Sequence, residues 1–406
     1  MQLNLFDMLD LYGDGQPLSN REIYDKLKRN GYVNEADLDA KVPVGLSGQS
    51  HSPGKRKFRW LQQSARLLGL LERVPDQRGV WRAVKKSELT PAPAGFMLLA
   101  FSTKLGLAIW GNCEDALTHL DHPITAVITS PPYLLKKARA YGGYSDEREY
   151  VAFLVKALEP VVKRMRPGGT IALNVTNDAF LNGLPARSLY RERLVLALHD
   201  ELGLQKLDTI CWVNKSKPPG PTQWACMRPT LLGVAYEPIY LFTNDPARSL
   251  CDNRRVLQPH TDRHLKLIGR GGEERTGRFG DGAYSIRPGS FARATSGALP
   301  RNVLEYGHKC GDLDAYRAYC REQGLPVHAA AMPLKLVLFL VQYLAAPGDL
   351  VVDLFSGTGT TGKACELSGR HWFMVERILQ HVVGAASRFR GCEDFEATWE
   401  DVVSFR

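Results

Sequence analysis

Residues 349–364 read DLVVDLFSGTGTTGKA, an apolar run that passes through a glycine-rich turn into a helical sequence. Gly357, Gly359 and Gly362 match the pattern G-x-G-x-x-G, in which glycines permit a tight turn and a close approach of the backbone to a ligand. Glu376 ends the next apolar run, 19 residues after Gly357, where a carboxylate can accept hydrogen bonds from both ribose hydroxyls. The stretch therefore predicts a strand, turn and helix that bind a nucleoside-bearing cofactor.

The same residues also approach the phosphate loop of nucleotide hydrolases, G-x-x-x-x-G-K, between Gly357 and Lys363. Ala364 stands where that loop needs a Ser or Thr hydroxyl to bind magnesium, so the nucleotide-hydrolase interpretation lacks its metal ligand. The glycines do not by themselves name the cofactor, and an NAD-linked oxidoreductase stays open at this point.

Outward from the glycine turn, apolar strand-like runs alternate with helical sequences. This alternation predicts a doubly wound α/β fold, with a mostly parallel, Rossmann-like sheet covered by helices on both faces. The expected strands are 126–130, 168–175, 208–213, 237–243 and 371–376, and the expected helices are 148–165, 191–202 and 332–344. Residues 246–306 interrupt this alternation of strands and helices, because they are rich in Gly, Arg, Ser and Pro.

A second motif follows the strand AVIT, where the chain reads Ser130-Pro131-Pro132-Tyr133. Two consecutive prolines hold the backbone extended and without N–H donors, so the carbonyl between them is a rigid acceptor. The Ser130 hydroxyl and the Pro131 carbonyl can accept hydrogen bonds from an exocyclic amine while Tyr133 stacks on its ring. The motif is therefore suited to a planar ring that carries an amine.

The first 90 residues predict a separate helical unit, joined through the proline-containing linker SELTPAPAGF at 87–96. Two helices, the first capped by Ser19 or Asn20, and a hairpin around residues 75–79 together resemble a winged helix. A basic cluster stands where a recognition helix would begin: Lys55, Arg56, Lys57 and Arg59. A helical dimerisation or docking module with a solvated basic face is the alternative.

The composition of the 406-residue chain narrows the class of protein. The 52 basic and 43 acidic residues give a net charge of +9, which favours a polyanionic partner such as nucleic acid. The 8 cysteines contain no C-x-x-C pair, and the histidines show no ligand spacing, so neither a disulfide framework nor a metal site is expected. We find neither an apolar run of membrane-spanning length nor a secretory signal, and we expect a cytoplasmic protein.

TSPPY followed about 220 residues later by DLFSGTGTTG resembles the S-adenosylmethionine-dependent DNA amino-methyltransferases of the β arrangement, in which the catalytic half precedes the cofactor half. Further matches, among them RPGGTIALNV at 166–175 and HWFMVE at 371–376, extend the resemblance over residues 100–390. It implies a catalytic half at 91–245, a target-recognition insertion at 246–306 and a cofactor-binding half at 307–406, behind the winged-helix-like unit at 1–90.

The resemblance also assigns residues to roles. It implies catalysis by Ser130, Pro131, Pro132 and Tyr133, and cofactor contacts at Asp353, Phe355, Ser356, Gly357, Gly359, Thr360, Thr361, Glu376 and Pro333. Asn112 stands where the family usually has Asp, and either it or Asp115 would contact the adenine edge. The basic residues proposed to contact DNA are Lys136, Lys137, Arg254, Arg255, Arg263, Arg275, Arg278 and Arg287.

In function, the resemblance implies methylation of an exocyclic amine on a base flipped out of DNA. In this family a Ser at the position of Ser130 goes mostly with cytosine N4, and N6-adenine methylation is the alternative. Carbon-5 methylation is disfavoured because it needs a Pro-Cys nucleophile, and none of the 24 prolines precedes a cysteine. A cognate restriction endonuclease is a possible partner, and a non-catalytic DNA-binding regulator with a degenerate cofactor domain is the alternative of another class.

Overall fold

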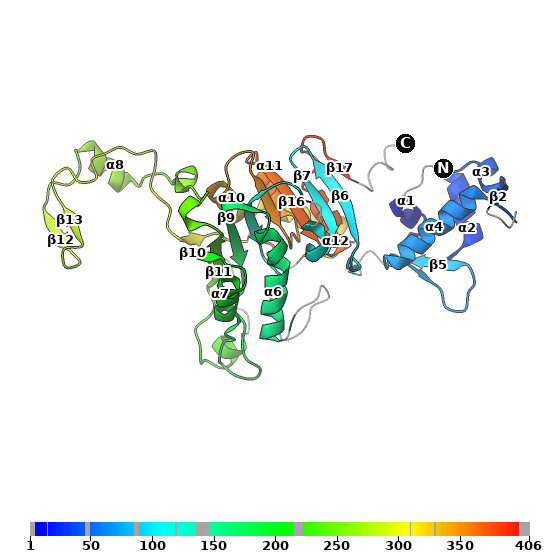
Figure 1. Ribbon diagram of the computed structural model, residues 1–406, viewed down its shortest axis with the longest axis horizontal. Coiled ribbons are helices and arrows are strands. Elements are labelled where there is room, and N and C mark those ends of the chain that lie inside the picture. Colours follow the sequence, from blue (N-terminus) through cyan, green and yellow to red (C-terminus); the bar gives the residue numbers. More distant parts are fainter. Residues whose placement is uncertain are drawn as a thin grey trace.

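The computed structural model describes residues 5–13, 15–44, 49–84, 89–117, 120–134, 144, 146–214, 222–308, 310–328 and 330–397. One large sheet with helices on both faces occupies the middle of the molecule (Figure 1). A small N-terminal unit lies beyond one end of the sheet, and an extended arm projects from the other end (Figure 1).

The central sheet has ten strands, and among the described residues only β11 and β6 run against the common direction. This confirms the predicted mostly parallel α/β sheet. Across the sheet the strands are β14 (Val303–Glu305), β10 (Gln205–Val213), β11 (Tyr236–Thr243), β9 (Met165–Asn174), β8 (Ile124–Thr129), β15 (Leu350–Asp353), β16 (His371–Glu376), β7 (Gly106–Gly111), β6 (Met97–Thr103) and β17 (Glu396–Ala397).

Successive residues of the central strands enter two different cores, as period-2 side-chain alternation requires. Val351 of β15 belongs to one apolar cluster and Val352 to the other. The cluster with Val351 also contains residues of α10 (Leu334–Leu344), α11 (Thr360–Glu366) and α12 (Leu379–Ala386). The cluster with Val352 contains α5 (Cys113–Ala116), α6 (Glu147–Val162) and α7 (Tyr190–Asp200). Both faces are therefore covered, as a doubly wound sheet demands.

The N-terminal unit combines short helices with a three-stranded sheet of order β1-β5-β4. The Ser19 hydroxyl accepts a hydrogen bond from the Glu22 N–H while the Glu22 carboxylate accepts from the Ser19 N–H, so Ser19 caps the helix as the sequence predicts. Its elements are α1 (Leu5–Tyr12), β1 (Leu18–Ser19), α2 (Asn20–Arg29), α3 (Glu35–Asp39), β2 (Val42–Val44), β3 (Gln49–His51), α4 (Pro53–Leu67), β4 (Leu71–Arg73) and β5 (Val80–Ala83).

Residues 246–306 are more ordered than the irregular segment that the sequence predicts. They contain η3 (Pro246–Arg248), η4 (Asn253–Val256), α8 (Asp262–Gly269) and the hairpin of β12 (Gly277–Phe279) with β13 (Tyr284–Ile286). Helix α8, β12 and β13 form the projecting arm in Figure 1. The last strand of the segment, β14, returns to the central sheet and pairs with β10. The helix α9 (Gly311–Glu322) follows and packs on α12.

Within the described ranges, no helix combines the length and the apolar character needed to cross a membrane. Helix α10, the most apolar run, is buried against the sheet instead.

Candidate active site

Both predicted motifs face one cavity of about 630 Å³. It lies at the carboxyl ends of β7, β8, β15 and β16, the edge of an open parallel sheet where ligands bind. The predicted residues that line it are Asn112, Ser130, Pro131, Pro132, Tyr133, Asp353, Phe355, Ser356, Gly357, Thr360, Thr361 and Glu376. Residues separated by more than 200 positions in the sequence therefore share one space.

The glycine-rich loop connects β15 to α11 as the sequence predicts. Gly357 and Gly359 have φ angles of 49° and 72°, a left-handed conformation that favours glycine. Gly359 caps α11 and lies outside the cavity lining, against Ala385 and Phe389. Gly362 has a packing role, because a Cβ there would meet the Met374 sulfur at 2.8 Å. The loop thus turns sharply and presents Ser356 and Gly357 to the cavity.

Asp353 joins the two motifs from inside the protein. Its carboxylate accepts hydrogen bonds from the hydroxyls of Thr129 at 2.7 Å and Thr361 at 2.6 Å, and from the N–H of Phe355 at 3.1 Å. Burial raises the pKa of Asp353 to about 6, and these three donors act in the opposite direction. Asp353 therefore ties the end of β8 to the start of α11.

Glu376 stands at the end of β16, in the wall of the cavity. Its carboxylate accepts hydrogen bonds from the N–H groups of Gly357 and Ile378, each at 2.8 Å. Burial acts to raise the pKa of Glu376, but His381, whose Nδ1 lies 3.7 Å away, together with the N–H of Ile378 and with His328 outweighs burial and leaves the pKa below its usual value. Glu376 is therefore held as a carboxylate with further acceptor capacity.

Two histidines in this wall are not predicted from the sequence as residues of the site. His328 and His381 both line the cavity, with ring centroids 4.6 Å apart in an edge-to-face arrangement. The spacing of the histidines predicts no ligand role for His328, and no motif in the sequence includes His381. Their separation by more than 50 positions carries no spacing signal, because the contact depends on how α12 folds back beside the loop before α10.

The Ser-Pro-Pro-Tyr loop is held by two residues that no sequence motif identifies, Asn174 and Glu237. The hydroxyls of Ser130 and Tyr133 lie 3.2 and 3.1 Å from Oδ1 of Asn174, and the Tyr133 hydroxyl also donates to Oε2 of Glu237 at 2.8 Å. Burial and the Glu237 carboxylate raise the pKa of Tyr133 well above its usual value, so its hydroxyl stays a donor. Asn174 ends β9 and Glu237 lies near the start of the antiparallel β11, which brings both beside the loop.

The two residues predicted to meet the adenine edge are both hydrogen-bonded to the segment before β6. Asn112 lines the cavity, and its side-chain amide donates to the carbonyl of Pro93 at 3.0 Å. Asp115, which also lines it, accepts from the N–H of Gly95 at 2.8 Å. Pro333 caps α10 outside the lining, whereas its neighbour Met332 faces the cavity.

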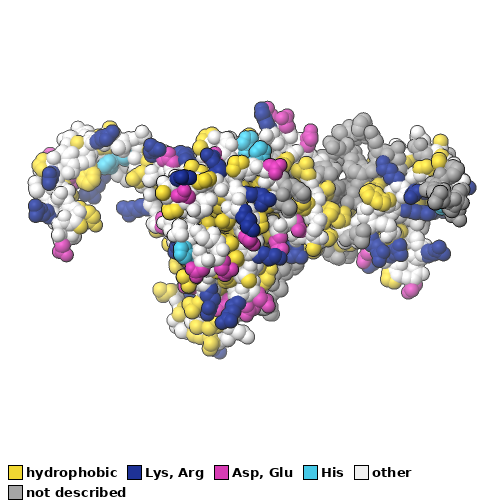
Figure 2. Space-filling model, in the orientation of Figure 1, with side chains coloured by type: hydrophobic (Ala, Val, Ile, Leu, Met, Phe, Trp, Pro, Cys, Tyr) yellow, Lys and Arg dark blue, Asp and Glu magenta, His cyan; other side chains and the backbone are white. Residues whose placement is uncertain are grey.

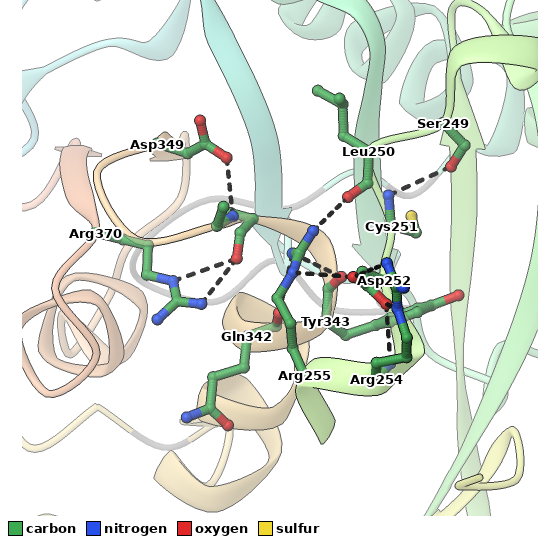
Figure 3. Close-up of polar contacts among 12 residues, drawn as sticks. Ser249, Leu250, Cys251, Asp252, Arg254, Arg255, Gln342, Tyr343, Asp349 and Arg370 are labelled. Carbon is green, nitrogen blue, oxygen red and sulfur yellow. Dashed lines mark hydrogen bonds and ion pairs between the residues drawn. The ribbon is translucent and has the colours of Figure 1, made fainter. Parts of the chain in front are cut away.

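Arg254 and Arg255, both predicted to contact DNA, differ in their surroundings (Figure 3). Arg254 is exposed and pairs with Asp252 at 2.9 Å. The guanidinium of Arg255 donates instead to the backbone carbonyls of Leu250, Gln342 and Tyr343, at 2.9, 3.2 and 3.3 Å. Three backbone acceptors hold Arg255, so it anchors the start of the arm to the end of α10.

Four of the remaining residues predicted to contact DNA lie outside the cavity lining. Arg263, Arg275, Arg278 and Arg287 are exposed on the arm. Exposed Phe279 and Tyr284 stand among them on the β12–β13 hairpin. Lys136 and Lys137 fall outside the described residues.

Comparison with known proteins agrees with this geometry. Residues 124–386 match the N6/N4 methyltransferase family, described as DNA methylase. Type II methyltransferase M.PvuII of Proteus hauseri is 31% identical over 291 residues, which are 71% of this chain and 85% of that protein. Type II methyltransferase M.BglII of Bacillus subtilis is 24% identical over 268 residues, which are 64% of this chain and 62% of that protein.

Among solved structures, PvuII DNA methyltransferase, described as cytosine-N4-specific, superposes with a TM-score of 0.55 and 25% sequence identity. The superposition covers 72% of this chain and 90% of that one. The family match contains β8 with the residues that follow it, the glycine-rich loop and Glu376. With the two motifs in one cavity and the match spanning more than half of its length, the chain belongs to the DNA methylase family of N6/N4 methyltransferases.

Proposed function

We propose that the protein transfers a methyl group from S-adenosylmethionine to the exocyclic N4 amine of cytosine in DNA. The N–CH3 bond would form as the S–CH3 bond breaks, with S-adenosylhomocysteine as the leaving group, and the amine would lose one proton. The observation that carries the proposal is the shared cavity, in which Ser130 and Tyr133 face the same space as Gly357 and Glu376. The specificity for cytosine is supported by Ser130 and by the cytosine-N4 specificity in the name of the PvuII structure.

The cavity suits S-adenosylmethionine in size and in charge. Glu376 keeps acceptor capacity for two ribose hydroxyls, and Asn112 or Asp115 would meet the adenine edge. The carboxylates of Glu114, Asp115 and Glu376 line the space and would favour a cationic sulfonium. When bound, this group supplies an electrophilic methyl carbon. Ser356, Thr360 and Thr361 would complete its surroundings, with Phe355 as an apolar wall.

The chain's own residues would bind and orient the base. A cytosine amine is inaccessible inside a duplex, so the base must be extruded, and Tyr133 would stack on its ring. The Ser130 hydroxyl and the Pro131 carbonyl would accept hydrogen bonds from the amine and stabilise the positive charge that develops on nitrogen. These acceptors also favour a tetrahedral nitrogen whose lone pair is available, which a conjugated amine otherwise lacks.

For DNA, we infer that the arm between 246 and 306 provides target recognition. Its support is the group of exposed Arg263, Arg278 and Arg287 beside exposed Phe279 and Tyr284, a combination suited to phosphates and base edges. Arg275 and Arg254, which pair with Glu273 and Asp252, would have to exchange these partners for phosphates. A restriction endonuclease acting on the same sequence is the proposed partner, because both named relatives are type II methyltransferases.

The proposal is tested by incubating the full chain with methyl-labelled S-adenosylmethionine and DNA of varied sequence, then digesting the DNA and identifying the labelled nucleoside. We expect N4-methylcytosine in one sequence context. Detection of N6-methyladenine would instead identify adenine as the target base. Binding of both substrates with no incorporation would favour a regulator and contradict the enzymatic proposal.

A further inference from the structure

The N-terminal unit, residues 5–84, lies outside the residues that match the methylase family. Its chain order places β1 between α1 and α2, and α4 directly before the β4–β5 hairpin, with β5 in the middle of the small sheet. In winged-helix units, the helix before the hairpin lies in the major groove and its N-terminal residues reach the bases. Helix α4 holds that position here.

Helix α4 has one buried face and one basic face. Phe58, Leu61 and Ala65 are buried, and they recur at the spacing of a single helical face. On the opposite side, Arg56, Arg59 and Trp60 are exposed, and Trp60 keeps 67% of its surface accessible. We call these three residues the α4 face. Arg56 and Trp60 also line a shallow hollow of about 370 Å³, together with Val42 and His51 of the β2–β3 ribbon.

The basic residues at the start of α4 oppose the helix dipole and therefore lower the stability of the helix. Its first turns carry Lys55, Arg56 and Lys57 with no acidic residue, although a helix N-terminus favours negative side chains. Lys55 is compensated by Asp39, 3.1 Å away. Within the described residues, no ion pair is found for Arg56 or Arg59. Uncompensated cations at the positive end of a helix attract an anionic partner.

The β4–β5 hairpin adds a second contact beside the helix. Its arginines at positions 73 and 82 are engaged inside the unit: Arg73 lies over the Trp81 ring, 4.9 Å from the centroid, and Arg82 pairs with Glu72. Arg78 is exposed in the turn between the strands. Lys and Arg side chains gather on the visible side of this unit in Figure 2.

We propose that the α4 face binds duplex DNA through the major groove, with Arg78 on the flanking phosphates. This second DNA-binding surface, at the end of the sheet opposite the arm, rests on the proposed action on DNA (Figure 1). Duplex DNA is the occupant that fits, because the face is cationic and exposed, and Trp60 offers an apolar surface with one N–H donor. A protein partner without an acidic surface would leave the charge of Arg56 and Arg59 unmatched.

The test compares the salt dependence of DNA binding in full-length variants. The double variant R56A/R59A removes two cations from the α4 face, and the control K104A/K163A removes two exposed cations from the β6–β7 turn and the end of α6. Affinity for a duplex is measured between about 50 and 200 mM salt, where each lost phosphate contact lowers the slope of log K against log salt by about 0.9. Thermal unfolding checks that all variants are folded.

We expect R56A/R59A to lower the slope by about 2 and the affinity by about tenfold, while K104A/K163A leaves the slope unchanged. W60A should weaken binding with the slope kept, because the indole carries no charge. A slope for R56A/R59A equal to that of the unaltered protein would overturn the proposal and leave a protein partner for the face. Methyl transfer is followed in the same samples, so that its absence in the unaltered protein contradicts the proposed function separately.

Discussion

Thr129 donates a 2.7 Å hydrogen bond to Asp353 across 224 positions of sequence. One residue precedes the Ser-Pro-Pro-Tyr loop and the other ends the strand before the glycine-rich loop. Both are buried, so the two loops are fixed to each other by a contact that solvent does not weaken. The position of the two halves of the cavity relative to each other therefore depends on the hydrogen bond between Thr129 and Asp353.

Thr129→Val should therefore destabilise the protein and loosen the cavity. Asp353 would lose one of three donors inside the protein, which costs about 1–3 kcal/mol of unfolding free energy. Chemical denaturation measures this loss. Thr209→Val, at a half-buried position of β10 outside this network, is the control. Equal stability of both variants would show that the Thr129 contact is dispensable.

Ser130→Ala should abolish most of the methyl transfer while leaving the affinity for S-adenosylmethionine unchanged. The alanine removes one acceptor for the amine, and a positioned group of this kind contributes about 10²-fold or more to kcat. Single-turnover transfer and equilibrium binding separate the two effects. Ser102→Ala on β6 removes a hydroxyl far from the loop as the control. A loss of cofactor binding with normal turnover per bound complex would contradict the role of Ser130.

Glu237 should act only through Tyr133. Glu237→Leu removes the acceptor of the Tyr133 hydroxyl and should reduce kcat by about tenfold, whereas Glu237→Gln keeps an acceptor and should retain most activity. A double-mutant cycle with Tyr133→Phe is the decisive measurement, because Glu237→Leu should have no further effect once the hydroxyl is gone. Additive losses would assign Glu237 an effect independent of Tyr133.

The raised pKa of Asp353 predicts that the stability of the protein depends on pH. Because burial raises its pKa to about 6 from an unfolded value of 3.8, its contribution to stability is fully present below pH 3.8 and is lost as the pH rises through about 6. The shift corresponds to about 3 kcal/mol. The stability of Asp353→Asn relative to the unaltered protein should therefore increase between pH 4 and pH 7. A constant difference over that range would exclude Asp353 as the titrating group.

Glu376 should control cofactor affinity rather than turnover. Glu376→Ala removes the proposed acceptor of the ribose hydroxyls and should raise the Kd for S-adenosylmethionine at least about tenfold, from hydrogen bonds worth more than about 1.4 kcal/mol together. Calorimetric titration measures the Kd. The exposed Glu393, which pairs with Lys104, offers Glu393→Ala as the matched control. An unchanged Kd in Glu376→Ala would place the ribose elsewhere in the cavity.

The sequence predicts the centre of the fold well because its signals are local. The apolar run before Gly357, the glycines and Glu376 all lie within 30 residues, and the structure places them as strand, turn and strand end. The β6–β7 hairpin was missed. Its strands are joined by only Lys104 and Leu105, so the sequence between Met97 and Gly111 contains no long loop to separate them.

The supporting residues of the site could not be predicted in the same way. Asn174 and Glu237 belong to different strands and meet Tyr133 only because β9 and β11 are antiparallel neighbours. Arg255 illustrates the opposite case: a basic residue in a basic segment predicts a DNA contact, but the fold surrounds it with backbone carbonyls. The sequence shows the charge and the chemical type of each side chain. Which distant residues it contacts depends on the topology of the fold.

The base of the arm is closed by a reciprocal backbone pair, in which Gln258 and Ala298 each donate an N–H to the other's carbonyl at 2.9 and 2.8 Å. The chain therefore leaves and rejoins the catalytic body at a single closed stem. The segment between Gln258 and Ala298 can therefore change in length or sequence without displacing the residues of the cavity. If the arm recognises the target as we propose, such a change would alter the DNA sequence that is bound and leave the residues of the cavity unchanged.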